Sequence, residues 1–160
     1  MELSKILNIP ARRLENLSYP ATLLLEWYRQ NQREMPWRKT ETFTPTPYQV
    51  WVSEIMLQQT RVEAVRGYYT RFIQQLPDIA ALASAPEDQL LKLWQGLGYY
   101  NRVRNMQKAA QQVMELYGGA LPADYKALQA LPGIGAYTAG AIASIAFGIP
   151  VPAPDGNVFR

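Results

Sequence analysis

The turn at residues 131–136 constrains the fold of this chain more than any other short segment, because it reads Leu–Pro–Gly–Ile–Gly–Ala. Gly133 and Gly135 permit a tight backbone turn that other residues adopt at a cost. A helical pattern precedes the turn, and the small and apolar residues after it predict a helix over 136–147. The sequence therefore predicts a helix–hairpin–helix unit, in which two helices meet at a sharp corner.

Such a corner has two interpretations. The free backbone amides and the positive dipole end of the second helix can hold a phosphate, which Gly133 and Gly135 would let come close. Phosphate contacts of this kind position a nucleic acid without reading its sequence. Alternatively, the glycines serve only the close packing of two helices. The turn by itself favours neither interpretation.

Helical patterns bounded by proline, glycine or capping residues extend along the rest of the chain. Thr60 and Glu63 match a capping box at the start of one helix. No segment shows strand alternation of convincing length, so the sequence predicts an all-α fold with many short helices. The predicted helices begin at Pro20 and then cover 47–59, 61–76, 78–83, 86–95, 99–117, 124–131 and 136–147.

The 160 residues include no cysteine and no histidine, and their formal net charge is +3. Disulfides, thiolate zinc sites, cysteine nucleophiles and histidine bases are thereby excluded within this chain. Any acid–base chemistry must use Asp, Glu, Lys or Tyr. The charge permits binding to nucleic acid without requiring it. No secretory signal or membrane-spanning run is visible, so we expect a soluble intracellular protein.

Two carboxylates stand out as candidates for chemistry. Glu54 lies in a helix that is apolar on nearly all sides, where burial would raise its pKa and keep it protonated. Asp155 follows a proline-rich extended segment. Cleaving a glycosidic bond needs one protonated acid and one carboxylate that stabilises a sugar cation. Each residue also has a purely structural alternative. Glu54 could lie at the margin of its helix and pair with an arginine, and Asp155 could cap a turn or a helix.

Other polar and aromatic residues lie where DNA contacts would be useful. Gln58–Gln59–Thr60 sits at a helix junction, and Tyr99–Tyr100 follows a glycine-rich turn. Such groups can enter the stack beside an extruded base, although capped helix ends and core tyrosines are common alternatives. Arg102, Arg104 and Lys108 form a basic helix end, which is either a solvated face or a surface that steers a DNA backbone.

Together these motifs resemble the adenine DNA glycosylases of the MutY type, which belong to the helix–hairpin–helix glycosylase superfamily. The resemblance covers roughly residues 22–160, with the motifs in the same order. It is carried by residues 51–60, 96–100, the hairpin with residues 137–139, and 155–157. We therefore expect an N-terminal extension at 1–19 and a catalytic domain at 20–160, with a six-helix barrel lobe and an incomplete second lobe.

The resemblance implies a base-excision repair enzyme that hydrolyses the N-glycosidic bond of adenine mispaired with 8-oxoguanine or guanine. Its partner would be double-stranded DNA containing a mispaired adenine. It would be a cytoplasmic, nucleoid-associated bacterial protein and a monomer when complete. Two alternatives stay open: a non-enzymatic DNA-binding helix–hairpin–helix fragment, or an endonuclease III-like glycosylase of other base specificity.

The resemblance also assigns roles to individual residues. Glu54 matches the acid that protonates the adenine leaving group, and Asp155 matches the carboxylate that stabilises the sugar cation. Tyr137 matches an active-site tyrosine, and Asn157 matches an asparagine that supports the site. The residues matched to the adenine pocket or to DNA contacts are Arg33, Trp37, Arg38, Gln58, Gln59, Thr60, Leu97, Tyr99, Gly133, Gly135 and Thr138.

One position distinguishes subfamilies on chemical grounds. Endonuclease III-type enzymes carry a lysine two residues after the second hairpin glycine, and its amine forms a Schiff base with the sugar. Tyr137 occupies that position here and has no amine. The sequence therefore predicts a monofunctional glycosylase without efficient strand cleavage.

The sequence departs from the family pattern at three places, one of which is the extension of residues 1–19 beyond the usual start. Pro154 precedes Asp155 where the family has an aliphatic residue. The chain ends at Arg160, before the four cysteines of the family's [4Fe–4S] cluster and its C-terminal domain for 8-oxoguanine recognition. We therefore expect a fragment that binds no cofactor itself and that can associate through an exposed apolar face.

Overall fold

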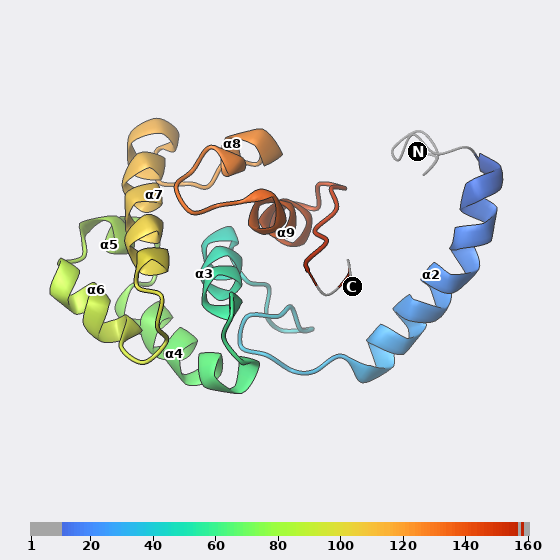
Figure 1. Ribbon diagram of the computed structural model, residues 1–160, viewed down its shortest axis with the longest axis horizontal. Helices are drawn as coiled ribbons and strands as arrows, with labels where there is room; N and C mark the ends of the chain where they lie inside the picture. Colours follow the sequence, from blue (N-terminus) through green and yellow to red (C-terminus); the bar gives the residue numbers. More distant parts are fainter. Residues whose placement is uncertain (1–10, 157, 159–160) are drawn as a thin grey trace. The chain divides into compact units, whose positions relative to one another are not determined.

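The computed structural model describes residues 11–156 and Val158, with side chains described from residue 21 onward (Figure 1). The chain divides into two compact units, residues 1–35 and 36–160. All regular elements of the described residues are helices, which confirms the predicted all-α class. They are α2 (Ala11–Asn31), α3 (Pro47–Leu57), α4 (Val62–Gln75), α5 (Ile79–Ser84), α6 (Glu87–Trp94), α7 (Asn101–Tyr117), α8 (Tyr125–Gln129) and α9 (Ala136–Phe147).

The first unit contains helix α2, which begins at Ala11 and continues through Pro20. The sequence predicted that this helix begins at Pro20. The apolar spacing of Leu14, Leu17 and Leu24 runs across the proline, and this favours one continuous helix although proline removes a backbone hydrogen bond. None of the described helices has the length and apolarity needed to cross a membrane.

The second unit is built around helix α3, which packs against both α4 and α9 (Figure 1). Its Trp51 side chain is fully buried. In the same unit α4 packs on α6, and Phe72 meets Trp94 edge to face with ring centroids 6.0 Å apart. Burying side chains of this size supplies much of the stability of the unit. This packing holds α3 and α9 in fixed positions, so that the side chains on their exposed faces are held in place as well.

Side-chain caps stabilise the starts of three described helices, α3, α5 and α8. At α3, Thr46 and Gln49 form a capping box with Pro47 in the first turn, an arrangement that stabilises a helix by about 1 kcal/mol. Asp78 caps α5 and Asp124 caps α8, as predicted. The capping box predicted at Thr60 is absent.

The start of α4 differs from that prediction because Thr60 lies one residue too early. The N-cap of α4 is Arg61, which makes no side-chain cap. The Thr60 hydroxyl instead donates to the carbonyl of Gln58 at 3.3 Å. The end of α3 therefore uses the hydroxyl that would have capped α4.

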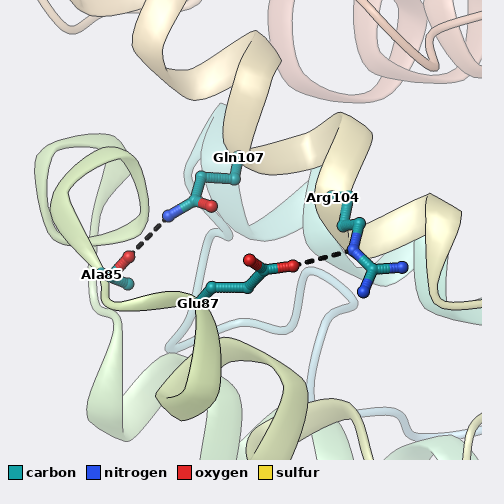
Figure 2. A network of polar contacts seen from close by, with 4 residues as sticks. All are labelled: Ala85, Glu87, Arg104 and Gln107. Atoms are coloured by element: carbon teal, nitrogen blue, oxygen red, sulfur yellow. Dashed lines mark hydrogen bonds and ion pairs between the residues drawn. The ribbon is translucent and has the colours of Figure 1, made fainter.

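Helix α7 is joined by two polar contacts to Ala85, which lies between α5 and α6, and to Glu87, the first residue of α6 (Figure 2). The Gln107 amide donates to the carbonyl of Ala85 at 2.6 Å, and Arg104 Nε donates to Glu87 at 2.9 Å. The Arg104–Glu87 pair is exposed, and such pairs contribute little to stability. The amide contact, whose acceptor is buried, is the more important of the two for placing α7.

The chain after α9 folds back along that helix. Gly148 adopts φ +65°, and the N–H of Ile149 donates to the carbonyl of Ala143 at 3.0 Å, which ends α9 in a Schellman-type turn. The returning segment crosses α9 at Gly140, where a Cβ atom would collide with the carbonyl oxygen of Pro152. Gly140 thus lets the segment that carries Asp155 lie against α9.

Replacing Gly140 with alanine should therefore destabilise the protein and displace this segment. We expect a loss of about 1–3 kcal/mol in the free energy of unfolding, as for other overpacked sites. Gly67→Ala is the matched control, because Gly67 also lies in a helix but has open space around it. That control should gain up to about 1 kcal/mol. Urea denaturation measures both, and equal effects would contradict the packing described here.

Candidate active site

Glu54 and Tyr137 meet where α3 packs against α9. Glu54 lies in the third turn of α3, and Tyr137 is the second residue of α9. The tyrosine hydroxyl donates a hydrogen bond to the Glu54 carboxylate. At the C-cap of α3, the Gln58 amide donates to the Thr138 hydroxyl at 3.2 Å. Residues four apart on one helix share a face, so this face of α3 fixes two successive residues of α9.

The Glu54 carboxyl has an unusual protonation equilibrium. Burial between the two helices raises its pKa above the ordinary value for glutamate. The hydrogen bond from Tyr137 and the charge of Arg38 oppose this effect but only partly offset it. Glu54 therefore holds its proton at a higher pH than a solvated carboxyl does, which is the property required of a general acid.

Tyr137 connects Glu54 to the second carboxylate. Burial and the negative charge of Glu54 raise the pKa of the tyrosine to about 12, and Asp155 contributes to the same shift. Tyr137 thus interacts electrostatically with both carboxylates. The Asp155 carboxylate also accepts a hydrogen bond from the N–H of Val158 at 3.0 Å. The site therefore places two carboxyl groups in different surroundings: Glu54 is partly buried between two helices, and Asp155 is held by a turn at the surface.

Two exposed residues near the ends of helices adopt a left-handed backbone. Gln59 has φ +57° and Tyr99 has φ +47°, and among the described residues they are the non-glycine residues with positive φ. Tyr99 is 66% exposed. This conformation costs a residue with a side chain about 1–3 kcal/mol, and such strain collects at functional sites. The predicted DNA-inserting residues are therefore held outward by a strained backbone.

The predicted hairpin forms between α8 and α9. Leu131 and Ile134 are buried and anchor it, and the exposed Gly133 adopts φ +77°. Gly135 is the N-cap of α9 and makes no side-chain cap. The first amides of α9 are consequently left for an external acceptor. Binding of a phosphate at this corner stays a prediction.

The remaining predicted site residues fall into three groups. Trp37 and Leu97 are buried, and Trp37 packs edge to face on Tyr69. Thr138 is only 2% exposed, so the free protein presents its hydroxyl to Gln58 rather than to solvent. Arg33 belongs to the first compact unit, residues 1–35. Asn157 lies outside the described residues.

Two residues important for the site had little signal in the sequence. Gly140 looked like one of several small residues in α9, and its role depends on a segment that returns from beyond the helix. Arg102 looked like part of a basic surface, but its guanidinium points into the protein and binds backbone carbonyls. The available signal for Arg102 was a positive charge in the first turn of a helix, where it is unfavourable.

The residues present do not fit an iron–sulfur cluster. The sequence has no cysteine, whereas such clusters are held by four thiolates. Within the described ranges, no three acidic side chains come close enough to hold another metal ion.

Comparison with curated proteins finds relatives named adenine DNA glycosylase. The rat protein is 51% identical over 142 residues, which cover 86% of this chain and 28% of the rat protein. The human protein is 49% identical over 142 residues, and these residues make up 26% of the human sequence. A relative from Buchnera aphidicola is 45% identical over 139 residues and is covered to 39%. The chain thus spans between a quarter and two fifths of these relatives.

Comparison with solved structures agrees. A thermostable thymine-DNA glycosylase superposes with a TM-score of 0.80 at 28% identity, covering 92% of this chain and 66% of that one. A trapped covalent complex of endonuclease III with DNA superposes with a TM-score of 0.74 and shares the fold. It is 23% identical, and the match covers 89% of this chain and 64% of that one. The model of the HhH-GPD superfamily of base excision DNA repair proteins matches residues 52–160. The chain belongs to this superfamily.

Proposed function

We propose that this chain forms the catalytic part of a monofunctional DNA glycosylase that removes adenine mispaired with 8-oxoguanine or guanine. The observation that carries the proposal is that Tyr137 interacts with Glu54 and, through its charge, with Asp155. A protonated and an ionised carboxyl are the two groups that cleavage of a glycosidic bond requires. The relatives named adenine DNA glycosylase support adenine as the base.

In the proposed reaction, Glu54 donates its proton to a ring nitrogen of the extruded adenine. The bond between the sugar C1′ and the adenine nitrogen then breaks, and its electron pair leaves with the base. The Asp155 carboxylate stabilises the positive charge that develops on the sugar. Water adds at C1′ and gives its proton to the ionised Glu54, which restores the acid, so the products are free adenine and an abasic site. Tyr137 has no amine, so no Schiff base forms.

The other predicted residues would hold the DNA. The hairpin amides near Gly133 and Gly135 would bind a backbone phosphate. Gln59 and Tyr99, which are exposed, would occupy the space left by the extruded base. Since the chain has no cysteine, we propose that it carries out these steps without binding an iron–sulfur cluster itself.

A single-turnover excision assay with the 160-residue chain tests the proposal. Duplexes carry 8-oxoguanine or guanine opposite adenine, and a third duplex has adenine in an ordinary pair with thymine. Alkali then reveals abasic sites as strand breaks at the adenine position. We expect excision from the two mispairs and little from the ordinary pair. DNA binding without excision from any duplex would support the non-enzymatic alternative.

The phosphate-binding role of the hairpin predicts a specific effect of Gly135→Ala. Gly135 has φ −82° and open space around it, so alanine should fold normally and leave Tm unchanged. Its methyl group would nevertheless stand where a phosphate approaches the α9 amides. We expect a lower affinity for undamaged duplex DNA, by roughly tenfold if one charge-assisted contact of about 1.5 kcal/mol is lost. Fluorescence anisotropy measures this affinity.

Gly133→Ala provides the contrasting variant. At φ +77° a Cβ atom would lie 2.9 Å from Cβ of Asn105, so this change should lower Tm as well as DNA affinity. If Gly135→Ala binds DNA like the wild-type protein, the hairpin is only a packing corner.

A further inference from the structure

Arg102 occupies a position that local helix energetics do not favour. It lies in the first turn of α7, where a positive charge opposes the helix dipole. Its side chain is also partly buried, and burial lowers its pKa. A cation in such a place needs compensating contacts. Those contacts show what this side chain does.

One arm of the guanidinium binds the end of α3. Arg102 Nη1 donates to the carbonyl of Ile55 at 2.9 Å and to that of Met56 at 3.3 Å. The same nitrogen also donates to the carbonyl of Gln58. Carbonyls in the last turn of a helix lack partners within the helix and carry its negative dipole end. Arg102 therefore fixes the backbone directly before Gln59.

The other arm binds the glycine-rich loop before α7. Arg102 Nη2 donates to the carbonyl of Leu97 at 3.1 Å and to that of Gly98 at 3.3 Å. It also donates to the Thr60 hydroxyl at 3.3 Å. The Tyr99 ring lies 5.7 Å from the guanidinium carbon, within the range of a cation–π contact. Arg102 thus holds the backbone before Tyr99 as well.

The two segments that Arg102 joins, 58–60 and 97–99, contain Gln59 and Tyr99. These are the two described non-glycine residues with a left-handed backbone. A strained conformation persists only where surrounding contacts enforce it. We propose that Arg102 is a positioning residue that sets the spacing of Gln59 and Tyr99, so that both enter an opened DNA stack together. This inference rests on the proposed function, since it assumes a duplex that must be held open.

Arg102→Lys is the sharpest test, because lysine keeps the charge but lacks the planar fork that reaches both segments. Arg104→Lys is the matched control, since Arg104 lies two residues along the same helix and makes an exposed pair with Glu87. Single-turnover excision is measured on adenine opposite 8-oxoguanine and on adenine opposite an abasic site. The second substrate is already unstacked and needs less support from inserted side chains.

We expect Arg102→Lys to slow excision from the 8-oxoguanine duplex by up to roughly a hundredfold, as for groups displaced by about an ångström. The loss should be at least several-fold smaller on the abasic substrate, and Arg104→Lys should match the wild-type protein on both. Equal losses on the two substrates would indicate a merely structural role and overturn the proposal. Full activity of Arg102→Lys would overturn it too.

A binding measurement keeps the inference separate from the proposed activity. A duplex holds a stable abasic analogue with 2-aminopurine beside it, whose fluorescence rises when neighbouring bases unstack. The wild-type chain should raise the fluorescence at saturating protein, and Arg102→Lys should raise it at most half as much. If the wild-type chain excises nothing, the proposed function fails, but this comparison still decides about Arg102.

Should Arg102→Lys not fold, Thr60→Val removes one acceptor of the same guanidinium, and its fluorescence rise should be smaller than that of the wild-type chain. If the variant that is tested, Arg102→Lys or Thr60→Val, raises the 2-aminopurine fluorescence as much as the wild-type chain does, the proposal is overturned.

Discussion

Replacing Glu54 with glutamine should reduce adenine excision by at least roughly a hundredfold, since a general acid contributes about 10²–10⁴-fold to a rate. Glutamine keeps the size of the side chain and can still accept the hydrogen bond from Tyr137, but it has no proton to donate to the leaving base. DNA binding should stay within about twofold of the wild-type value. Single-turnover kinetics and anisotropy measure the two effects separately.

Glu87→Gln is the control for this variant, because Glu87 forms an exposed pair with Arg104 far from any proposed chemistry. It should leave excision unchanged. Excision by Glu54→Gln at the rate of this control would show that another group supplies the proton.

Glu54→Gln should also stabilise the protein at neutral pH. Because the folded-state pKa of Glu54 is raised, the folded protein binds its proton more tightly than the unfolded chain does. Stability from this group is therefore fully present below the ordinary glutamate pKa and is lost as the pH rises through the higher folded pKa. The variant should have a higher Tm than wild type at pH 7 and no advantage at pH 4. A lower Tm at both values would contradict the burial described for Glu54.

Replacing Asp155 with asparagine should reduce excision by roughly 10²–10³-fold, the usual effect of removing one group that stabilises a developing charge. Asparagine can still accept the hydrogen bond from the N–H of Val158, so the local turn should form. The loss should appear in the maximal single-turnover rate while the affinity for the mispaired duplex changes little.

Asp124→Asn controls for the change of residue type. Asp124 accepts a hydrogen bond from the N–H of Ala127 at 2.7 Å, with the same three-residue spacing as the contact of Asp155. Asparagine caps a helix about as well as aspartate, so this variant should keep both stability and excision. A similar loss of activity in the two variants would point to folding rather than chemistry.

Local signals were sufficient to predict most of the fold from the sequence. The start of α3 at Pro47, the caps at Asp78 and Asp124 and the hairpin before α9 all depend on residues close together in the chain. One prediction failed because a distant group competed for a side chain. Thr60 does not cap α4, because its hydroxyl contacts Gln58 and Arg102.

The candidate site was less predictable, because its parts come from distant segments. The environment of Glu54 follows from the apolar pattern of α3, but its hydrogen bond to Tyr137 depends on how α3 packs against α9. The position of Asp155 depends on Gly140, which permits the returning segment to touch the helix. Packing of this kind is not encoded in any single stretch of residues. The roles assigned to the DNA-contacting residues stay predictions.

The most direct test of the proposed chemistry is to identify what the 160-residue chain releases from a duplex with adenine opposite 8-oxoguanine in the presence of borohydride. Mass spectrometry of the products follows both the free base and any covalent adduct between protein and DNA. The proposed hydrolysis at Glu54, Tyr137 and Asp155 predicts free adenine, an abasic strand that breaks only in alkali, and no adduct. A trapped adduct in high yield, or release of a different base, would contradict it.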